Sequence, residues 1–372
     1  MERFVIEGGR RLSGTVTPAG NKNAALPLLA ASLLTNSELV LRNMPQIGDV
    51  TTKIALLEQL GARVQPHGDH SWAIRADTVG GAEPDAALAR KIRTSILLAG
   101  PLLARRGHVT LPRPGGDQIG RRRLDTHFLA LQALGVSVEI TPTAYEMRTE
   151  RLRGADIFLD EMSVTATEQA ILTAVLAEGA TTISNAASEP HIQDLCNCLN
   201  AMGARIGGIG TNCLAIDGVS RLHGTDFTIG PDYMEVVSFL GLAAVTGSAI
   251  RIAGARPREH RMTRIAFSKL GVTWSEDGQD ILVPANQELA VQSDAHDAIP
   301  QIHSAPWPGF NTDLLITALV VATQARGTVL IHEKMFENRL FFVDRLIAMG
   351  ARIILCDPHR AVVAGPAQLY GE

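Results

Sequence analysis

The sequence predicts a mixed α/β protein built from a unit that recurs every 68 to 79 residues. A helical segment that ends in glycine and runs into a β-type segment occurs five times, as "EQLGARV", "QALGVSV", "NAMGARI", "SKLGVTW" and "IAMGARI". A second helix-to-strand passage, such as "LLTNSELVLRNMP", precedes each copy, and "RLSGTV", "RLRGAD" and "RLHGTD" form a third marker. Because three independent markers share one period, chance Leu-Gly pairs do not explain them.

Each unit is predicted to run strand–helix–strand–helix–strand–strand. A glycine directly after the last periodic residue ends a helix, and the strand follows at once. The five glycines in this place are Gly61, Gly135, Gly203, Gly271 and Gly350. The closing "QLYGE" resembles the start of a sixth unit, so we expect five of six units, with the C-terminal one missing.

The two halves of the chain are also related, because "IEGGRRLSGTV" at 6–16 matches "IDGVSRLHGTDF" at 216–227. We therefore expect two domains of similar construction. Residues 20–230 form an inserted domain with three βαβαββ units and a mobile loop at 113–123. Residues 1–19 plus 231–372 form the second domain, and a cleft between such domains is a usual place for a ligand.

Composition excludes several classes of partner. Apolar residues make up 46% of the chain and aromatic residues only 4%, which suits helices packed on sheets. A net charge of −4 and a pI near 6.3 are not typical of a nucleic-acid or membrane-surface protein, so any anion site is local. The start "MERFVIEGGRR" has no secretory pattern, and the four cysteines form no zinc pattern. We expect reduced thiols and a cytoplasmic protein with no nucleic-acid or membrane partner.

The stretch "GGDQIGRRR" at 115–123 is the first candidate for chemistry. Its glycines allow a tight turn or a close approach to a ligand, and three consecutive arginines suit an anionic partner. Asp117 is then either a salt-bridge partner of the arginines or a group that reacts beside them.

Two further stretches carry cations. "AGNKNAAL" places Lys22 and Asn23 in a turn before a helix, which predicts an anion site or, alternatively, a solvated lysine beside an Asn cap. "ARKIRTSILL" places Arg90 and Arg93 three residues apart on one helix face, which is also typical of a solvated surface.

Two helix starts are candidates for binding. Thr165 and Glu168 have the spacing of a capping box, which places Ser163 and Val164 at a helix start where a phosphate could bind. "GFNTDLLITALV" puts Asp313 at an N-cap, where an aspartate also has a purely structural use.

Other motifs carry less information. Glu337 and Arg339 in "MFENRLFF" precede a helix without a distinctive spacing, and no histidine pattern is typical of a metal site. The sequence also has no phosphate-binding P-loop and no dinucleotide fingerprint, so we expect no metal and no organic cofactor.

Taken together, "GNKNAALP", "IRTSILLAGPLLAR", "PGGDQIGRRRLDTH", "FNTD" and "FENR" resemble the enolpyruvyl transferase family over the whole chain. The resemblance implies an inside-out α/β barrel of two domains made of βαβαββ units. It also implies a transferase that moves enolpyruvyl from phosphoenolpyruvate to the 3′-hydroxyl of UDP-N-acetylglucosamine and releases phosphate. This reaction is the first committed step of peptidoglycan synthesis, and it connects the protein to cell-wall growth, cell shape and cell division.

The resemblance also implies residue roles. Asp117, Lys22 and Asp313 are the expected catalytic residues, with Asp313 as the base for the sugar hydroxyl. Lys22 and Arg122 are expected to hold phosphoenolpyruvate, with Arg93 nearby. The expected nucleotide-sugar residues are Asn23, Arg122, Arg123, Leu124, Asp125, Thr126, Ser163, Val164, Asp313 and Met335.

Asp117 stands where most relatives carry a cysteine that acts as the acid of a mobile loop. The nearby arginines favour its charged form, so desolvation on loop closure has to restore the acid. Because fosfomycin alkylates that cysteine in relatives, we expect this protein to resist it.

Three departures from the family pattern leave alternatives open. Glu161 replaces a frequent lysine, Tyr233 replaces a frequent arginine, and the absent last unit carries a further arginine in relatives. One alternative is an inactive, shortened homologue or fragment that binds a nucleotide sugar. The other is a 3-phosphoshikimate 1-carboxyvinyltransferase. The lysine loop of that second enzyme carries serines and an arginine that "GNKNAAL" lacks.

Overall fold

The computed structural model describes residues 5–116 and 119–371, which form two compact units. The inserted unit comprises residues 19–116 and 122–230, and the terminal unit comprises residues 5–18, 119–121 and 231–371. Each unit has its own hydrophobic core, built mostly from Ala, Leu, Ile and Val.

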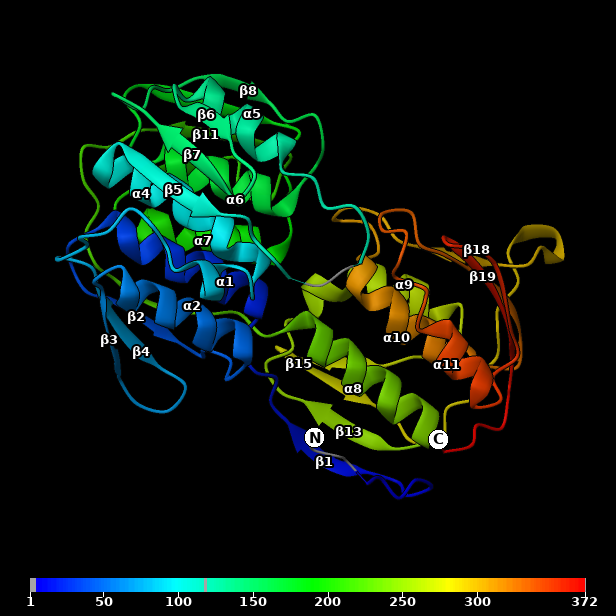
Figure 1. Cartoon of the computed structure of the whole chain (residues 1–372). Helices are drawn as coiled ribbons and strands as arrows, with labels where there is room; N and C mark the ends of the chain where they lie inside the picture. Colours follow the sequence, from blue (N-terminus) through cyan, green and yellow to red (C-terminus); the bar gives the residue numbers. More distant parts are fainter. Residues whose placement is uncertain (1–4, 117–118, 372) are drawn as a thin grey trace. The chain divides into compact units, whose positions relative to one another are not determined.

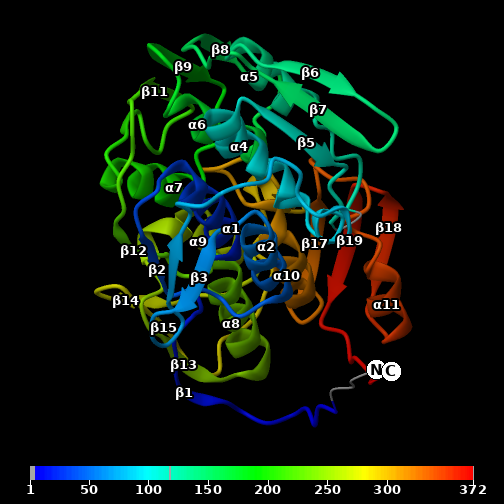
Figure 2. The same cartoon turned by 60° about the vertical axis from the view of Figure 1, so that its left-hand side comes forward.

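The inserted unit contains three sheets, two of four strands and one of three. The first has the order β12-β2-β4-β3, with β12 Asp226–Thr228, β2 Leu39–Arg42, β4 Trp72–Arg75 and β3 Arg63–Pro66. The second has the order β5-β7-β6, with β5 His108–Pro112, β7 Ala144–Arg148 and β6 Ser137–Ile140 (Figure 2). The third has the order β10-β11-β9-β8, with β10 Arg205–Gly207, β11 Cys213–Asp217, β9 Ala180–Ser184 and β8 Asp156–Phe158.

The helices of the inserted unit lie inside its sheets (Figure 1). They are α1 Lys22–Ala31, α2 Gly48–Gln59, α3 Ala86–Ala89, α4 Ala99–Arg106, α5 Asp125–Ala133, α6 Val164–Ala174 and α7 Pro190–Ala201, with the 3-10 turns η1 Ser32–Leu34 and η2 Arg93–Leu98. All residues of α1 from position 24 on and all of α6 from position 166 on are buried. A helix that is buried on every side belongs in a core, whereas β11 alternates exposed and buried residues as a covering sheet does.

The terminal unit repeats this arrangement with two sheets in its described residues. One has the order β1-β13-β15-β14, with β1 Ser13–Val16, β13 Ala249–Ile252, β15 Asp280–Val283 and β14 Ser275–Asp277. The other has the order β16-β17-β19-β18, with β16 Gln301–His303, β17 Gly327–His332, β19 Arg360–Gly365 and β18 Ile353–Asp357. Its helices are α8 Tyr233–Thr246, α9 Arg261–Ser268, α10 Thr312–Ala322 and α11 Val343–Ala348, with η3 Pro257–His260 and η4 Ala295–Asp297.

Helices α8 and α10 pack closely because α8 carries a glycine at their contact. A Cβ atom at Gly241 would lie 2.9 Å from the Thr317 Cγ2 atom and 3.1 Å from the Val321 Cγ2 atom. A side chain on Gly241 would therefore push the two helices apart.

The five sheets correspond to the five predicted repeats. In each four-stranded sheet two strands run parallel and the other two join antiparallel, as a strand–helix–strand–helix–strand–strand unit requires. The five glycines predicted to end helices all have a positive φ, between 81° and 102°. These observations confirm the predicted α/β repeat fold.

Strands β1 and β12 each pair with a strand that is distant in the sequence. The early strand β1 pairs in parallel with β13, so residues 13–16 belong to the terminal unit. Strand β12 pairs in parallel with β2 and belongs to the inserted unit. The chain therefore enters the inserted unit after residue 18 and leaves it after residue 230. Among the described residues, no helix is long and apolar enough to cross a membrane.

Candidate active site

Lys22 is the first residue of α1, which differs from the sequence prediction. Asn21 is the N-cap, and its side-chain oxygen accepts hydrogen bonds from the backbone N–H groups of Asn23 and Ala24 at 2.8 and 3.3 Å. Lys22 and Asn23 therefore lie within the first turn, not before it. The Lys22 Nζ atom lies 3.5 Å from the Asp49 Oδ2 atom, and its side chain is 34% exposed. An exposed lysine on the first turn of a helix favours an anion there.

Arg93 does not share a helix face with Arg90, so this prediction is wrong. Arg90 follows the last residue of α3, Arg93 begins η2, and the extended backbone of Ile92 separates them. The Arg93 Nη2 atom donates to the backbone carbonyls of Arg122 and Arg123 at 2.8 and 2.9 Å. Arg93 thus holds the chain that leads from the arginine run into α5.

The environment of Arg93 is unusual for an arginine. Burial, with a smaller contribution from Arg122, lowers the pKa of Arg93 to about 10, while Tyr145 opposes the shift. Its Nε atom is buried and has no hydrogen-bond partner among the described residues. A buried donor without a partner is rare in proteins and suits a ligand or a water molecule.

Residues 122–126 lie where α5 begins. Leu124 precedes the helix, and Asp125 is its first residue. The Arg123 Nε atom donates to the Asp125 Oδ2 atom at 3.0 Å, and the Thr126 hydroxyl donates to the Asp160 Oδ1 atom at 2.7 Å. These bonds give the start of α5 a defined polar surface.

Helix α6 begins beside α5, with Ser163 as its N-cap and Val164 as its first residue. The Ser163 hydroxyl oxygen accepts from the Ala166 N–H group at 3.4 Å, so the predicted capping box of Thr165 and Glu168 is wrong. The Thr165 hydroxyl instead lies 3.0 Å from the Nε2 atom of buried His127. The predicted helix start at Ser163 and Val164 is confirmed.

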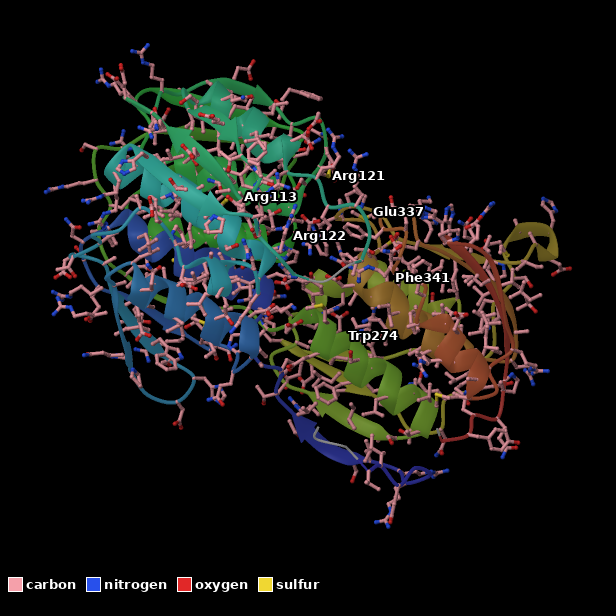
Figure 3. All side chains as sticks on the ribbon, viewed as in Figure 1. Arg113, Arg121, Arg122, Trp274, Glu337 and Phe341 are labelled. Atoms are coloured by element: carbon pink, nitrogen blue, oxygen red, sulfur yellow. The ribbon has the colours of Figure 1, made fainter. Side chains whose placement is uncertain are left out.

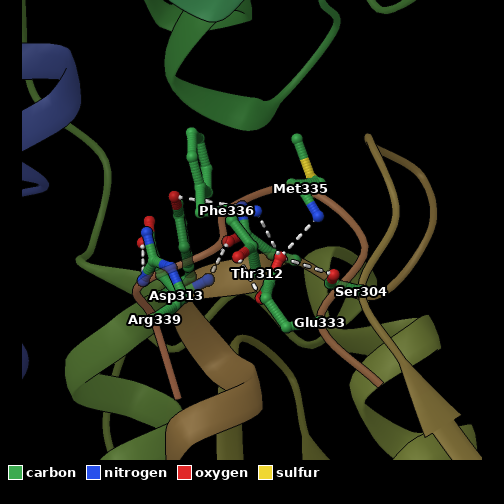
Figure 4. A network of polar contacts seen from close by, with 9 residues as sticks. Ser304, Thr312, Asp313, Glu333, Met335, Phe336 and Arg339 are labelled. Atoms are coloured by element: carbon green, nitrogen blue, oxygen red, sulfur yellow. Dashed lines mark hydrogen bonds and ion pairs between the residues drawn. The ribbon is translucent and has the colours of Figure 1, made fainter. Parts of the chain in front are cut away.

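In the terminal unit, Asp313 forms an ion pair that the sequence did not reveal. Its Oδ1 atom lies 2.8 Å from the Arg339 Nη1 atom, and the Arg339 side chain is only 10% exposed (Figure 4). Asp313 is not the N-cap of α10, because Asn311 holds that place and accepts from the Asp313 N–H group at 2.7 Å. Arg339 belongs to the "FENR" stretch, but the spacing of Glu337 and Arg339 in that stretch did not predict the ion pair with Asp313.

The fully buried Glu333 connects α10 to the turn that carries Met335 (Figure 4). Its Oε2 atom accepts from the Thr312 hydroxyl at 2.6 Å. Its Oε1 atom accepts from the Ser304 hydroxyl at 2.9 Å and from the N–H groups of Met335 and Phe336 at 2.7 and 3.2 Å. One carboxylate therefore positions both Asp313, on α10, and Met335. A lone glutamate after a strand gave no sequence signal for this role.

Residues 119–121 belong to the terminal unit. The Asn338 N–H group donates to the Ile119 carbonyl at 3.1 Å, and the Arg121 N–H group donates to the Glu337 Oε2 atom at 3.2 Å (Figure 3). Hydrogen bonds from the backbone of Glu337 and of Arg121 lower the pKa of Glu337. The expected acid, Asp117, lies outside the described residues.

Two of the three departures from the family pattern, Glu161 and Tyr233, lie at helix starts. The Glu161 carbonyl accepts from the Ser163 N–H group at 2.7 Å, just before α6. The buried Tyr233 begins α8, and its hydroxyl accepts from the Asn311 side chain at 3.4 Å. The described residues contain no group of three or more His, Cys, Asp or Glu side chains that could hold a metal ion.

Comparisons with known proteins agree with this architecture. The family model of EPSP synthase (3-phosphoshikimate 1-carboxyvinyltransferase) matches residues 6–369. The UDP-N-acetylglucosamine 1-carboxyvinyltransferases of Treponema denticola and Treponema pallidum are 54% and 53% identical to this chain, over 100% of it and 87% of their own length. The enzyme of that name from Bradyrhizobium diazoefficiens is 52% identical, over 99% of this chain and 85% of its own.

Solved structures share the fold at lower identity. The enolpyruvyl transferase NikO from Streptomyces tendae has a TM-score of 0.85 at 23% identity, over 98% of this chain and 85% of its own. EPSP synthase from Acinetobacter baumannii has a TM-score of 0.72 at 16% identity, over 97% and 83%. Buried helices wrapped by repeated sheets therefore define an enolpyruvyl transferase fold. The chain belongs to the EPSP synthase family of transferases, and within it to the UDP-N-acetylglucosamine 1-carboxyvinyltransferases.

Proposed function

We propose that this protein transfers the enolpyruvyl group of phosphoenolpyruvate to the 3′-hydroxyl of UDP-N-acetylglucosamine and releases phosphate. One observation carries the proposal: relatives with that activity in their name are 48% to 54% identical over at least 98% of the chain. The polar groups of the two units supply what such a reaction needs. It needs cations for a carboxylate and a phosphate, a base for the hydroxyl, and an acid for carbon.

Lys22 and Arg122 hold phosphoenolpyruvate in this proposal, and Arg93 lies nearby. The position of Lys22 on the first turn of α1 supports its role, since an anion there meets both a lysine and the positive end of the helix dipole. The hydrogen bonds of Arg93 to the carbonyls of Arg122 and Arg123 support the role of Arg122, because they hold the backbone of these two arginines in place.

The nucleotide sugar lies against the starts of α5 and α6. Polar groups and the positive dipole ends of two neighbouring helices support this placement, because a diphosphate is bound by such groups. The residues assigned to this site are Asn23, Arg122, Arg123, Leu124, Asp125, Thr126, Ser163, Val164, Asp313 and Met335.

Asp313 accepts the proton of the sugar 3′-hydroxyl while the oxygen attacks C2 of phosphoenolpyruvate. The ion pair with Arg339 supports this role, because it orients an ionised carboxylate, which only accepts hydrogen bonds. Asp117 delivers a proton to C3 in the same addition. Loss of one C3 proton and of phosphate then restores the double bond in the product.

The wider role follows from the substrates. We propose that the protein acts in the cytoplasm on two small molecules, in peptidoglycan synthesis, and so serves cell shape and cell division. Its free cysteines, among them buried Cys196 and Cys198, suit a reducing compartment. We also propose that the domains are residues 20–230 and residues 1–19 plus 231–372, which the division into two units supports.

A phosphate-release assay with purified protein tests the reaction. Both substrates together should release phosphate, each alone should not, and mass spectrometry should find enolpyruvyl-UDP-N-acetylglucosamine. Calorimetric binding of UDP-N-acetylglucosamine without phosphate release would instead support an inactive nucleotide-sugar-binding homologue. Phosphate release with 3-phosphoshikimate as the acceptor would support the other enzyme of the family.

A further inference from the structure

Lys53 on α2 is a lysine without access to solvent. Its relative exposure is 0%, and its Nζ atom donates to the Thr94 carbonyl oxygen at 2.6 Å. Lysine is almost never fully buried unless it is paired. Burial lowers the pKa of Lys53 to about 7, while the charge of Glu168 opposes the shift.

An acidic group on the core helix α6 acts electrostatically on Lys53. Glu168 is 1% exposed, and its pKa is raised by burial and by Glu189 and lowered by Lys53. Burial of a lysine and of a carboxyl group is weak evidence for stability, because well-packed apolar residues often do as well or better. The buried lysine therefore calls for a reason other than stability, and its contact with Thr94 provides one.

Thr94 belongs to a short segment, residues 90–94, on which both ends of the loop 113–123 rest. At the entry of the loop, a Cβ atom on Gly115 would lie 1.7 Å from the Arg90 carbonyl oxygen, and one on Gly116 would lie 2.9 Å from the Arg93 Cβ atom. At the exit, Arg93 donates to the carbonyls of Arg122 and Arg123. Residues 90–94 therefore support the loop both where it begins and where it ends.

Among the described residues, the Lys53 hydrogen bond is the one side-chain contact that ties this support to the core at Thr94, since the Thr94 hydroxyl is buried and has no hydrogen-bond partner there. The Thr94 carbonyl belongs to the planar peptide group that Thr94 shares with Ser95. Only the two soft dihedrals of Thr94, within the same 3-10 turn, separate this group from Arg93, so the contact restricts Arg93 as well.

We propose that Lys53 is a positioning residue for phosphoenolpyruvate binding: by holding the Thr94 carbonyl from within the core, it sets Arg93 and both ends of the loop 113–123. This role rests on the proposed function, in which Arg122 and the loop serve phosphoenolpyruvate. Lys53 itself touches no substrate.

The test uses the double variant Lys53→Met/Glu168→Gln in the full chain, because Lys53→Met alone would leave a buried carboxylate uncompensated. We expect the KM for phosphoenolpyruvate to rise by at least about tenfold, while the KM for UDP-N-acetylglucosamine changes by less than about threefold. Glu168→Gln keeps the Lys53–Thr94 contact and should leave both values within about threefold of wild type. Lys269→Met is a matched control, since Lys269 also donates to a backbone carbonyl, that of Gln301 at 3.2 Å.

A second measurement needs no turnover. Trypsin should cut after the arginines at 121–123 at least about fivefold faster in the double variant than in the wild type or in either control, because the support of residues 122 and 123 by Arg93 is weakened. Unchanged cleavage would overturn the proposal, even if the protein proved inactive. Faster cleavage with both KM values raised equally, or with neither raised, would also overturn it. Phosphate release absent from the wild type would refute the proposed function instead.

Discussion

The carboxylate of Asp313 lies 2.8 Å from the guanidinium of Arg339, and this arginine is nearly enclosed, with 10% of its side chain exposed. The two residues come from the start of α10 and from the chain before α11. The contact orients one oxygen of the carboxylate toward Arg339, and the backbone of α10 fixes the rest of the side chain. Asp313 is thereby held in one position, as a base for a bound hydroxyl has to be.

Asp313→Asn should lower kcat by about 10²- to 10⁴-fold, because an amide cannot take the hydroxyl proton. Its size is conserved, so the Kd for UDP-N-acetylglucosamine, measured by calorimetry, should stay within about threefold. Asp344→Asn, at an exposed aspartate in α11, is the control and should keep full activity. A kcat for Asp313→Asn within tenfold of wild type would exclude Asp313 as the base.

Asp117→Asn should abolish phosphate release while both substrates still bind, since an amide cannot deliver a proton to carbon. Calorimetry and the phosphate assay together measure this separation. Because residue 117 is an aspartate and carries no thiol, mass spectrometry after incubation with fosfomycin should find no adduct on this residue. Full activity of the asparagine variant, or an adduct on Asp117, would contradict the assignment.

Glu333→Leu should lower the free energy of unfolding by several kcal/mol, because each buried donor that loses its acceptor costs about 1–3 kcal/mol. Glu333→Gln should retain most of the stability, since its oxygen can keep the bonds of Oε1 and its amide can donate to Thr312. Urea unfolding measures both. Glu288→Leu is the control, because its ion pair with Arg326 is exposed and such pairs contribute about 0–1 kcal/mol. Equal losses for the Leu and Gln variants at 333 would contradict the hydrogen-bonding role.

His127 should make stability depend on pH. Burial, then the charges of Arg93 and Arg122, lower the pKa of His127 to about 3 in the folded protein. The unfolded chain binds this proton below about pH 6.5 and the folded protein does not, so stability is lost as pH falls from 6.5 toward 3. The loss between pH 6.5 and 5 should be about 1.5 kcal/mol for this group.

The pH dependence can be measured by urea unfolding of wild type and of His127→Leu, in which this share of the loss should disappear. The exposed His223 provides the control variant His223→Gln, whose profile should follow the wild type. An unchanged slope in His127→Leu would show that His127 is not the group that titrates.

Local sequence signals predicted the regular parts of the fold well. A glycine after a periodic segment ends a helix wherever it stands, because the left-handed conformation strongly favours glycine. Helix starts were predicted less well. Asn21 and Asn311 cap their helices, one residue before Lys22 and two residues before Asp313, because several neighbouring polar residues can each serve as a cap.

The candidate site was identified by resemblance, but its contacts were not predictable. Arg90 and Arg93 have helical spacing, yet the extended Ile92 separates them. Glu168 has the spacing of a capping box, yet it is buried in the core, where the charge of Lys53, 115 positions earlier in the chain, lowers its pKa against the effect of burial. Spacing reports only which residues can share a face, whereas long-range packing decides which elements meet.

The sequence by itself determined the repeated α/β units and where their helices end, because these depend on periodicity and on glycine, which act within a few residues. Only the tertiary structure decided that Arg339 pairs with Asp313, that Glu333 links Thr312 to Met335, and that Lys53 reaches Thr94. Each of these contacts joins elements that are distant in the chain. Their formation depends on how the buried helices and the sheets around them pack, and no local pattern encodes that arrangement.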